Sequence, residues 1–297
     1  MKDIIYLEKP VLRDPHLVLG FEGWPNAAEV SSFAVDHLID KLGAKQFASI
    51  PYEKFNPLSL SRPVATIKGG KVTDLTFSGN HFHYAETSSS HDIILFRGTE
   101  PTFEWEGFCD SLLGLAEMFR VSQIFTIGGT YDYVPHTVPP IVSAVFNHDD
   151  LREKLVKAGL SLTEYTGPIS IHTFLLTAAT RRGMEGVGLW GHAPQYLQGR
   201  NLKVVCAVLK GLSELTGLEV DLADLEKASE YFDEQVKQLV EDDPKMQEVI
   251  HRLEEIYHAS DRVPPLSRKR EESKKEERVI TIRGFLKKRE DEGKKES

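Results

Sequence analysis

Residues 16–26 read HLVLGFEGWPN, and they decide the fold class of this chain. The first six form a short apolar run that is typical of a strand buried on both faces. The turn after it ends at Asn26, a residue type that often caps a helix. Apolar residues then recur every three or four positions, which predicts a helix with one buried face formed by Ala27, Val30, Ala34, Leu38 and Leu42.

The same alternation of strand and helix returns along the chain. Strands are predicted at 47–50, 93–96, 124–127 and 186–191, and helices at 102–119, 151–158, 171–182 and 202–215. Strands that alternate with helices predict an α/β fold with a mostly parallel sheet and helices on both faces.

Residues 62–85 interrupt this alternation. Two runs rich in β-branched residues, 64–67 and 72–77, flank the sequence Lys68-Gly69-Gly70-Lys71. Glycines between such runs predict a β-hairpin. We expect this hairpin to be an antiparallel insertion that leaves the main sheet.

The C-terminal part divides into two further units after an α/β domain at 1–220. In residues 221–260, Asp221 and Asp243-Pro244 mark two helix starts, which predicts a helical hairpin. Its apolar stripe must be buried against the body or another subunit. Residues 261–297 contain 13 basic and 9 acidic residues, too many charges to bury, which predicts a disordered tail.

An apolar island interrupts the charged tail, where residues 279–286 read VITIRGFL. An extended segment of this kind can add to the edge of a sheet, so one hypothesis is a short docking motif for another protein. The alternative is a segment without a partner. The candidate partner-binding residues are Val279, Ile280, Ile282, Phe285 and Leu286.

Composition limits the class of protein. No apolar run reaches the roughly 18 residues of a membrane helix, and residues 1–8 lack a signal-peptide pattern, so we expect a cytoplasmic protein without membrane contact. Two cysteines cannot form a disulfide framework. The net charge of −9 combines −13 over residues 1–260 with +4 over residues 261–297. An acidic body repels phosphates, so nucleic acid is not an expected partner.

Glycines at strand ends mark the candidate ligand sites, because ligands of open α/β sheets bind beyond the carboxyl ends of strands. A pocket there is one interpretation, and close packing of strands against loops is the other. Glu22 and Glu100 could likewise act as an acid–base pair or serve as structural partners of backbone amides or arginines. The candidate ligand-binding residues are Gly23, Arg62, Gly98, Thr99, Glu100, Gly128, Gly129 and Thr130.

The sequence contains no complete catalytic, cofactor or metal motif. Residues 128–130 lack the lysine and the spacing of a phosphate-binding loop, and no Gly-x-Ser-x-Gly occurs. His81 and His83 would face one side of a strand, but a metal site needs a third ligand. His91, His136 and His192 are possible third ligands, but the sequence does not define how far they lie from His81 and His83. We expect neither a cofactor nor a metal.

Several short strings occur in one order along residues 1–230. They are LGFEGW at 19–24, Arg62-Pro63, FRGTEP at 96–101 with Trp105 and Phe108 after it, Gly128-Gly129, YTGP at 165–168 and APQY at 193–196. Together they resemble the proteasome-assembly-chaperone-two family, particularly its prokaryotic members, which are often labelled as uncharacterised proteins of an ATP-grasp type. The chain has no lysine-bearing phosphate loop and no clear acidic metal cluster to match that label.

The resemblance implies an α/β fold like that of purine nucleoside phosphorylases, and homo-oligomerisation. Relatives that act on proteasomes dock through a C-terminal hydrophobic–Tyr–any ending, whereas this chain ends in GKKES at 293–297. The resemblance favours an oligomeric protein-interaction or assembly-chaperone-like protein without evident catalysis, whose partners are further copies of itself and another protein at the tail. The alternative is a small-molecule or nucleotide-binding enzyme with a phosphorylase-like fold.

Overall fold

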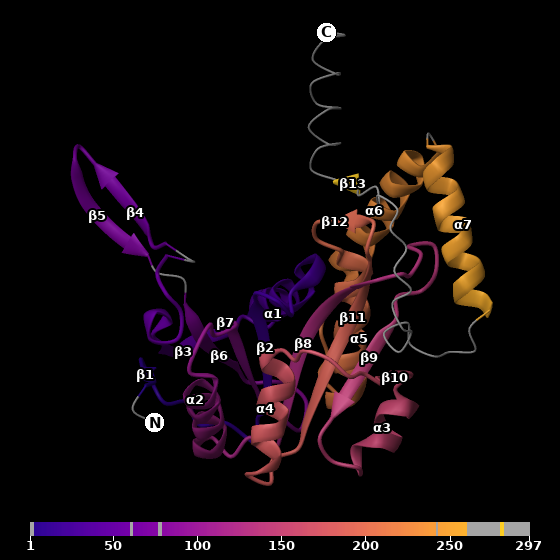
Figure 1. Ribbon diagram of the computed structural model, residues 1–297. Helices are drawn as coiled ribbons and strands as arrows, with labels where there is room; N and C mark the ends of the chain where they lie inside the picture. The colour runs from indigo at the N-terminus through magenta and orange to yellow at the C-terminus, as the bar shows by residue number, and fades with distance from the viewer. Residues whose placement is uncertain (1–2, 60–61, 77–78, 242, 260–279, 282–297) are drawn as a thin grey trace.

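A nine-stranded sheet forms the centre of the computed structural model, which describes residues 3–59, 62–76, 79–241, 243–259 and 280–281 (Figure 1). The strand order is β1-β3-β6-β7-β2-β8-β11-β9-β10. These strands are β1 (Ile5–Tyr6), β2 (His16–Glu22), β3 (Lys45–Ile50), β6 (Asn80–Ala85), β7 (Ile93–Thr99), β8 (Gln123–Asp132), β9 (Val142–Phe146), β10 (Ser161–Leu162) and β11 (Gly186–Pro194).

The four central strands, β7, β2, β8 and β11, run parallel to one another. This confirms the predicted α/β fold with a mostly parallel sheet. On one flank β6, β3 and β1 are each antiparallel to their neighbours, and on the other β9 is antiparallel to β11. The predicted strand at 47–50 is β3 of the antiparallel flank, because a strand–helix pattern does not define the direction in which a strand pairs.

Helices cover both faces of the sheet. Val18 faces the side on which Val35 of α1 and Val208 of α5 pack, whereas its neighbour Leu17 faces Leu112 of α2 and Leu175 of α4. Both strand faces are therefore buried, as the continuous apolar runs predict. The helices are η1 (Ala27–Glu29), α1 (Val30–Lys41), η2 (Tyr52–Lys54), α2 (Trp105–Met118), α3 (Leu151–Lys157), α4 (Ile171–Thr180), α5 (Leu202–Thr216), α6 (Ala223–Glu241) and α7 (Pro244–Ala259).

Two helices begin later than predicted. Helix α1 begins at Val30, because Ala28 and Glu29 adopt left-handed φ angles of 53° and 56°. The Asn26 side chain instead accepts the N–H of Ser32 at 2.9 Å and holds the loop. Likewise, Thr102, the first residue of the helix predicted at 102–119, hydrogen-bonds Asn56, and α2 begins at Trp105.

The predicted hairpin insertion is confirmed. Strands β4 (Val64–Lys68) and β5 (Lys71–Thr76) form an antiparallel sheet of their own, which projects from the body (Figure 1). We call residues 62–76 the arm.

The predicted C-terminal helical hairpin is α6 with α7. Asp221 accepts the N–H of Ala223 at 3.0 Å, and Asp243 accepts that of Lys245 at 3.0 Å, so both predicted helix starts carry a cap. The apolar stripe of the hairpin packs on the body of its own chain through a cluster formed by Val236, Met246, Ile250, Leu253, Tyr196 and Leu197. None of the helices in the described ranges is long and apolar enough to cross a membrane.

A short piece of the apolar island reaches the same region. Strand β13 (Ile280–Thr281) pairs in parallel with β12 (Leu197–Gln198). The other candidate residues of the island, Val279, Ile282, Phe285 and Leu286, lie outside the described residues.

Candidate functional site

Glu100 joins three loops at the carboxyl edge of the parallel strands. It follows β7, and its own N–H donates to the Glu22 carbonyl at the end of β2 at 2.9 Å. Its carboxylate accepts the N–H of Trp24 at 3.2 Å and the N–H of Ile171, the first residue of α4, at 2.9 Å. Burial raises the pKa of Glu100, although these two donors act in the opposite direction. The contacts give Glu100 a loop-positioning role.

Two further candidates beside Glu100 have structural partners. Gly23 adopts a φ of +107°, and a Cβ there would lie 3.1 Å from the Cβ of Glu100, so glycine permits this turn. The Glu22 carboxylate pairs with the Arg97 guanidinium at 2.6 Å, which is the structural alternative raised for this carboxylate. Arg62 lies apart from them and is exposed at the base of the arm.

Gly98 and Thr99 contact a buried asparagine on the neighbouring strand. The N–H of Thr99 donates to Oδ1 of Asn80 at 2.9 Å. A Cβ on Gly98 would lie 2.6 Å from that oxygen and 2.5 Å from the Phe96 ring. The glycine therefore makes room for packing between β6 and β7.

Gly128 and Gly129 lie on β8, where two bulky neighbours approach the backbone closely. A Cβ on Gly128 would lie 2.7 Å from the Trp190 ring, and one on Gly129 would collide with the carbonyl oxygen of Ala27. Thr130, the next residue, is partly exposed. The structure thus places Gly23 beside Glu100, and places Gly128 and Gly129 inside the packing of β8 against its neighbours.

Exposed apolar side chains gather on the loops that Glu100 joins. Trp24 carries one of its partner amides, Ile169 lies two residues before the other, and Phe103 lies three residues after Glu100. Tyr131 lies two residues after Gly129, which is bridged to Asn26. Between 40% and 61% of each of these side chains is exposed. Exposed aromatic groups of this density are characteristic of protein-binding surfaces. We call Trp24, Phe103, Tyr131, Tyr165 and Ile169 the carboxyl-edge surface.

A buried polar network lies beneath this edge. Nδ1 of His192 bonds Oδ2 of Asp132 at 2.7 Å, and its Nε2 bonds Oγ of Ser143 at 2.8 Å. Asp132 and His192 lie near the ends of the adjacent strands β8 and β11, and Ser143 lies on β9. The order serine–histidine–aspartate is that of a nucleophilic triad.

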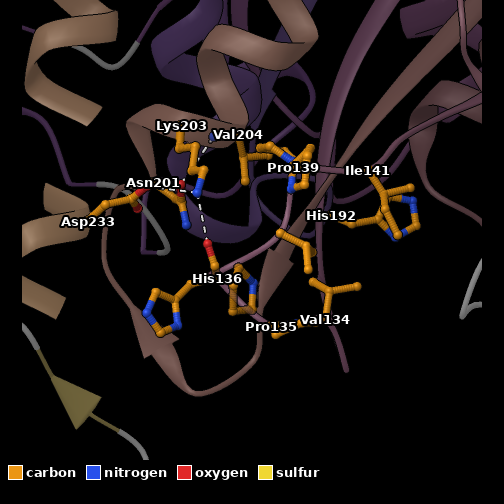
Figure 2. Close-up of a pocket in the computed structure, with 13 residues that line it drawn as sticks. Val134, Pro135, His136, Pro139, Ile141, His192, Asn201, Lys203, Val204 and Asp233 are labelled. Atoms are coloured by element: carbon orange, nitrogen blue, oxygen red, sulfur yellow. Dashed lines mark hydrogen bonds and ion pairs between the residues drawn. The ribbon is translucent and has the colours of Figure 1, made fainter. Parts of the chain in front are cut away.

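No substrate can reach the serine of this network in the structure. The side chain of His192 and the residue Ser143 are fully buried. His192 also lines a pocket, together with Ile141 and Val204, and Figure 2 shows this pocket. That pocket has a volume of about 10 Å³, which is room for a single water molecule. The network is therefore a packing element in this conformation.

A second polar network in Figure 2 holds the helical hairpin on the body. Nζ of Lys203, on α5, donates to the His136 carbonyl at 2.8 Å and to Asp233 of α6 at 2.7 Å. The Tyr196 hydroxyl accepts the N–H of His136 at 2.7 Å and bonds its ring nitrogen at 2.8 Å. Burial lowers the pKa of His136.

The histidine pair of the sequence lies on β6, with ring centroids 6.4 Å apart. Across the described part of the chain, no group of three His, Cys, Asp or Glu residues could hold a metal ion. His91 stacks on His16, and His136 and His192 belong to the two networks above.

Sequence reasoning did not find either network. Asp132 and Ser143 lie 60 and 49 residues from His192 in the sequence, and no motif spacing links them. Asp233 and Lys203 belong to separate helices whose packing the sequence pattern does not define. Phe103 and Tyr131, by contrast, lie next to predicted strand-end motifs, which is a usable signal for exposed loop residues.

The mostly parallel sheet with helices on both faces places the chain in the class of α/β proteins, and its sequence matches one family of that class. The chain belongs to the PAC2 family, whose sequence model matches residues 20–240. The resemblance drawn from the short strings is thereby confirmed. No curated protein matches the chain.

This chain aligns with solved structures of similar proteins over nearly the whole length of those proteins. A PAC2 family protein from Streptomyces avermitilis is 30% identical, with a TM-score of 0.73 over 80% of this chain and 100% of that one. A proteasome-assembly chaperone homologue from Mycobacterium tuberculosis is 27% identical, with a TM-score of 0.72 over 79% and 99%. PbaB of Pyrococcus furiosus, an archaeal proteasome activator, is 25% identical, with a TM-score of 0.63 over 80% and 99%.

Proposed function

We propose that this chain is an oligomeric, cytoplasmic protein of the assembly-chaperone type that binds proteasome subunits and catalyses no reaction. The carboxyl-edge surface is the docking site in this proposal. Its apolar side chains supply the contact area, and Glu100 fixes the loops that carry them.

The observation that carries the proposal is the concentration of exposed aromatic residues on the motif-bearing loops. Trp and Tyr are the residue types most enriched at binding hot spots, because they offer a large contact area at a low entropy cost. Trp24 and Tyr131 provide both types here. The pocket of Figure 2 has room for about one water molecule, which is too little for a small ligand.

Similar proteins support the choice of partner. One relative is described as a proteasome-assembly chaperone homologue and another as a proteasome activator. Both align over about four-fifths of this chain.

Binding measurements with purified proteasome subunits from the organism that encodes the chain test this proposal. Trp24→Ala and Tyr131→Ala should each weaken binding of the immobilised chain at least tenfold. Val156→Ala is the matched control, because Val156 is as exposed as Trp24 but lies on α3. No binding by the wild type, or equal loss in the control, would refute the proposal.

A small-molecule enzyme is the second candidate, and the Asp132–His192–Ser143 network is the observation that favours it. Opening of the loop that follows β8 would have to expose Ser143 before it could attack an ester. Hydrolysis of a chromogenic ester by the wild type, abolished in Ser143→Ala, would support this candidate. Equal background rates in both proteins would remove it.

A further inference from the structure

The arm has one apolar face. Paired residues of an antiparallel ladder share a face, and the pairs Ala65–Leu75 and Ile67–Val72 are separated by one residue on β4. An irregularity at Thr73 keeps both pairs on the same side, so these four residues form a single strip. Ile67, Val72 and Leu75 are between 49% and 62% exposed.

This face is not buried by the arm's own subunit. An isolated two-stranded ribbon is marginal in water and normally packs its apolar face on another element. Figure 1 shows the arm projecting from the β3 and β6 flank of the body, away from all labelled helices. Its apolar strip therefore has the character of an interaction surface.

The tip of the arm is basic, whereas the helical hairpin is acidic. Lys68 and Lys71 lie at the tip, and together with Arg62 at the base and Asp74 they give the arm a net charge of +2. Residues 221–259 carry 12 acidic and 4 basic residues, a net charge of −8. Opposite charge on two separate patches favours their association and selects the orientation.

Helix α6 presents a matching apolar group within its acidic side. Tyr231 is 68% exposed, Glu234 lies three residues after it on the same side of the helix, and Glu230 directly precedes it. The buried stripe of α6, which includes Val236, faces the body instead. The exposed Tyr231 ring, with an acidic helix around it, complements the apolar strip, and the lysine pair Lys68–Lys71 lies at the tip of the arm on the opposite face of the ribbon.

We infer that the arm of one copy docks on helix α6 of a second copy, with its apolar strip against Tyr231 and with its basic tip toward the acidic side of the helix that contains Glu230 and Glu234. Figure 1 places the arm and α6 on opposite flanks of one subunit, so the contact must join two subunits. The inference rests on the oligomeric part of the proposed function and names its interface.

Unlike patches on opposite flanks give a head-to-tail contact. Repetition of such a contact closes a ring when the rotation between subunits fits, and otherwise gives an open filament. Each carboxyl-edge surface remains outside this contact, so client binding and self-association are carried by separate surfaces.

Charge reversal on each side tests this interface through the mass of the full-length protein in solution. The wild type should have a mass that is a multiple of 33.5 kDa, and Lys68→Glu with Lys71→Glu should reduce it to the monomer. Glu230→Lys with Glu234→Lys should do the same. All four changes together should restore the assembly, because both charges are then inverted. Lys154→Glu with Lys157→Glu on α3 is the control of equal charge change.

Every outcome decides the inference. A monomeric wild type, an arm variant that keeps its mass, or a quadruple variant that stays monomeric would overturn it. An arm variant that loses proteasome-subunit binding but not its mass would assign the arm to another protein. Binding of proteasome subunits to the monomeric variants tests the proposed function separately from the arm interface, since the carboxyl-edge surface is unchanged in these variants.

Discussion

The carboxylate of Glu100 accepts the backbone N–H of Ile171 at 2.9 Å and thereby ties the loop after β7 to the first turn of α4. Its second oxygen accepts the N–H of Trp24. One side chain thus fixes three loops that lie far apart in the sequence. Charge on Glu100 is also favoured by the partial positive charge at a helix N-terminus. The residue that looked like an acid–base candidate acts as an anchor for exposed aromatic groups.

Replacing Glu100 should show this anchoring in the free energy of unfolding. Glu100→Ala leaves two backbone donors without their acceptor and should cost about 2 kcal/mol, whereas Glu100→Gln keeps one acceptor and should cost about half as much. Urea unfolding measures both. Equal stability of all three proteins would show that the two hydrogen bonds do not hold the loops.

Gly128→Ala should destabilise the protein by about 2 kcal/mol or more, because the added methyl group would lie 2.7 Å from the Trp190 ring. Gly107→Ala is the matched control. Gly107 lies within α2, where the closest atom to an added Cβ is 3.8 Å away. Since alanine is the better helix former, we expect a gain of about 0.5 kcal/mol. Thermal unfolding of both variants decides between packing and a ligand role for Gly128, because a residue kept for a ligand should tolerate the methyl group.

His172 should make the protein sensitive to acid. It is buried between Phe21 and Trp190, and neither ring nitrogen has a hydrogen-bond partner within the described chain. Burial lowers the pKa of His172 from 6.5 to about 3. Between these values the unfolded chain binds a proton that the folded chain does not. The contribution of His172 to stability is therefore fully present above pH 6.5 and falls by about 1.4 kcal/mol per pH unit below it.

His172→Phe should remove this contribution while filling a similar volume. From pH 6 to pH 4 the variant should lose about 2 kcal/mol less than the wild type in urea unfolding. His16 and His83, whose pKa values are lowered to about 4 by burial, remain in both proteins and cancel in the difference. Parallel pH profiles of the two proteins would contradict the burial of a neutral His172.

Lys203→Met should loosen the helical hairpin. Asp233 of α6 would lose its cation while its side chain stays about two-thirds buried, at a cost of about 1–3 kcal/mol. Lys210→Met removes the other pair between α5 and α6, but Lys210 and Glu226 are each about half exposed, so little change is expected there. Hydrogen exchange of α6 and α7 amides should speed up in the first variant only.

Much of the fold could be predicted from short patterns. The run from His16 to Phe21 predicted a buried strand, and Asp243-Pro244 predicted a helix start within one residue. The left-handed residues Ala28 and Glu29 were not predictable, because their conformation is imposed by the Asn26 side chain and the bridge to Gly129. The antiparallel pairing of β6 within the main sheet was not predicted either, because β6 joins the sheet only after the arm has reversed the chain.

The site was less accessible to sequence reasoning. Glu100 stood out as a residue at a strand end, but its two donors lie 76 and 71 residues away. The Asp132–His192–Ser143 network depends on the pairing of β8, β9 and β11, which no local pattern encodes. Gly128 and Gly129 were open to two interpretations, and their surroundings match the packing one.

The most direct test of the central claim is hydrogen–deuterium exchange of the full-length protein with and without proteasome subunits. The carboxyl-edge surface should become protected in the loops around Trp24, Phe103, Tyr131 and 165–171, while α3 keeps its exchange rate. Protection confined to other elements, or no protection at saturating subunit concentration, would contradict the assignment of this surface as the docking site.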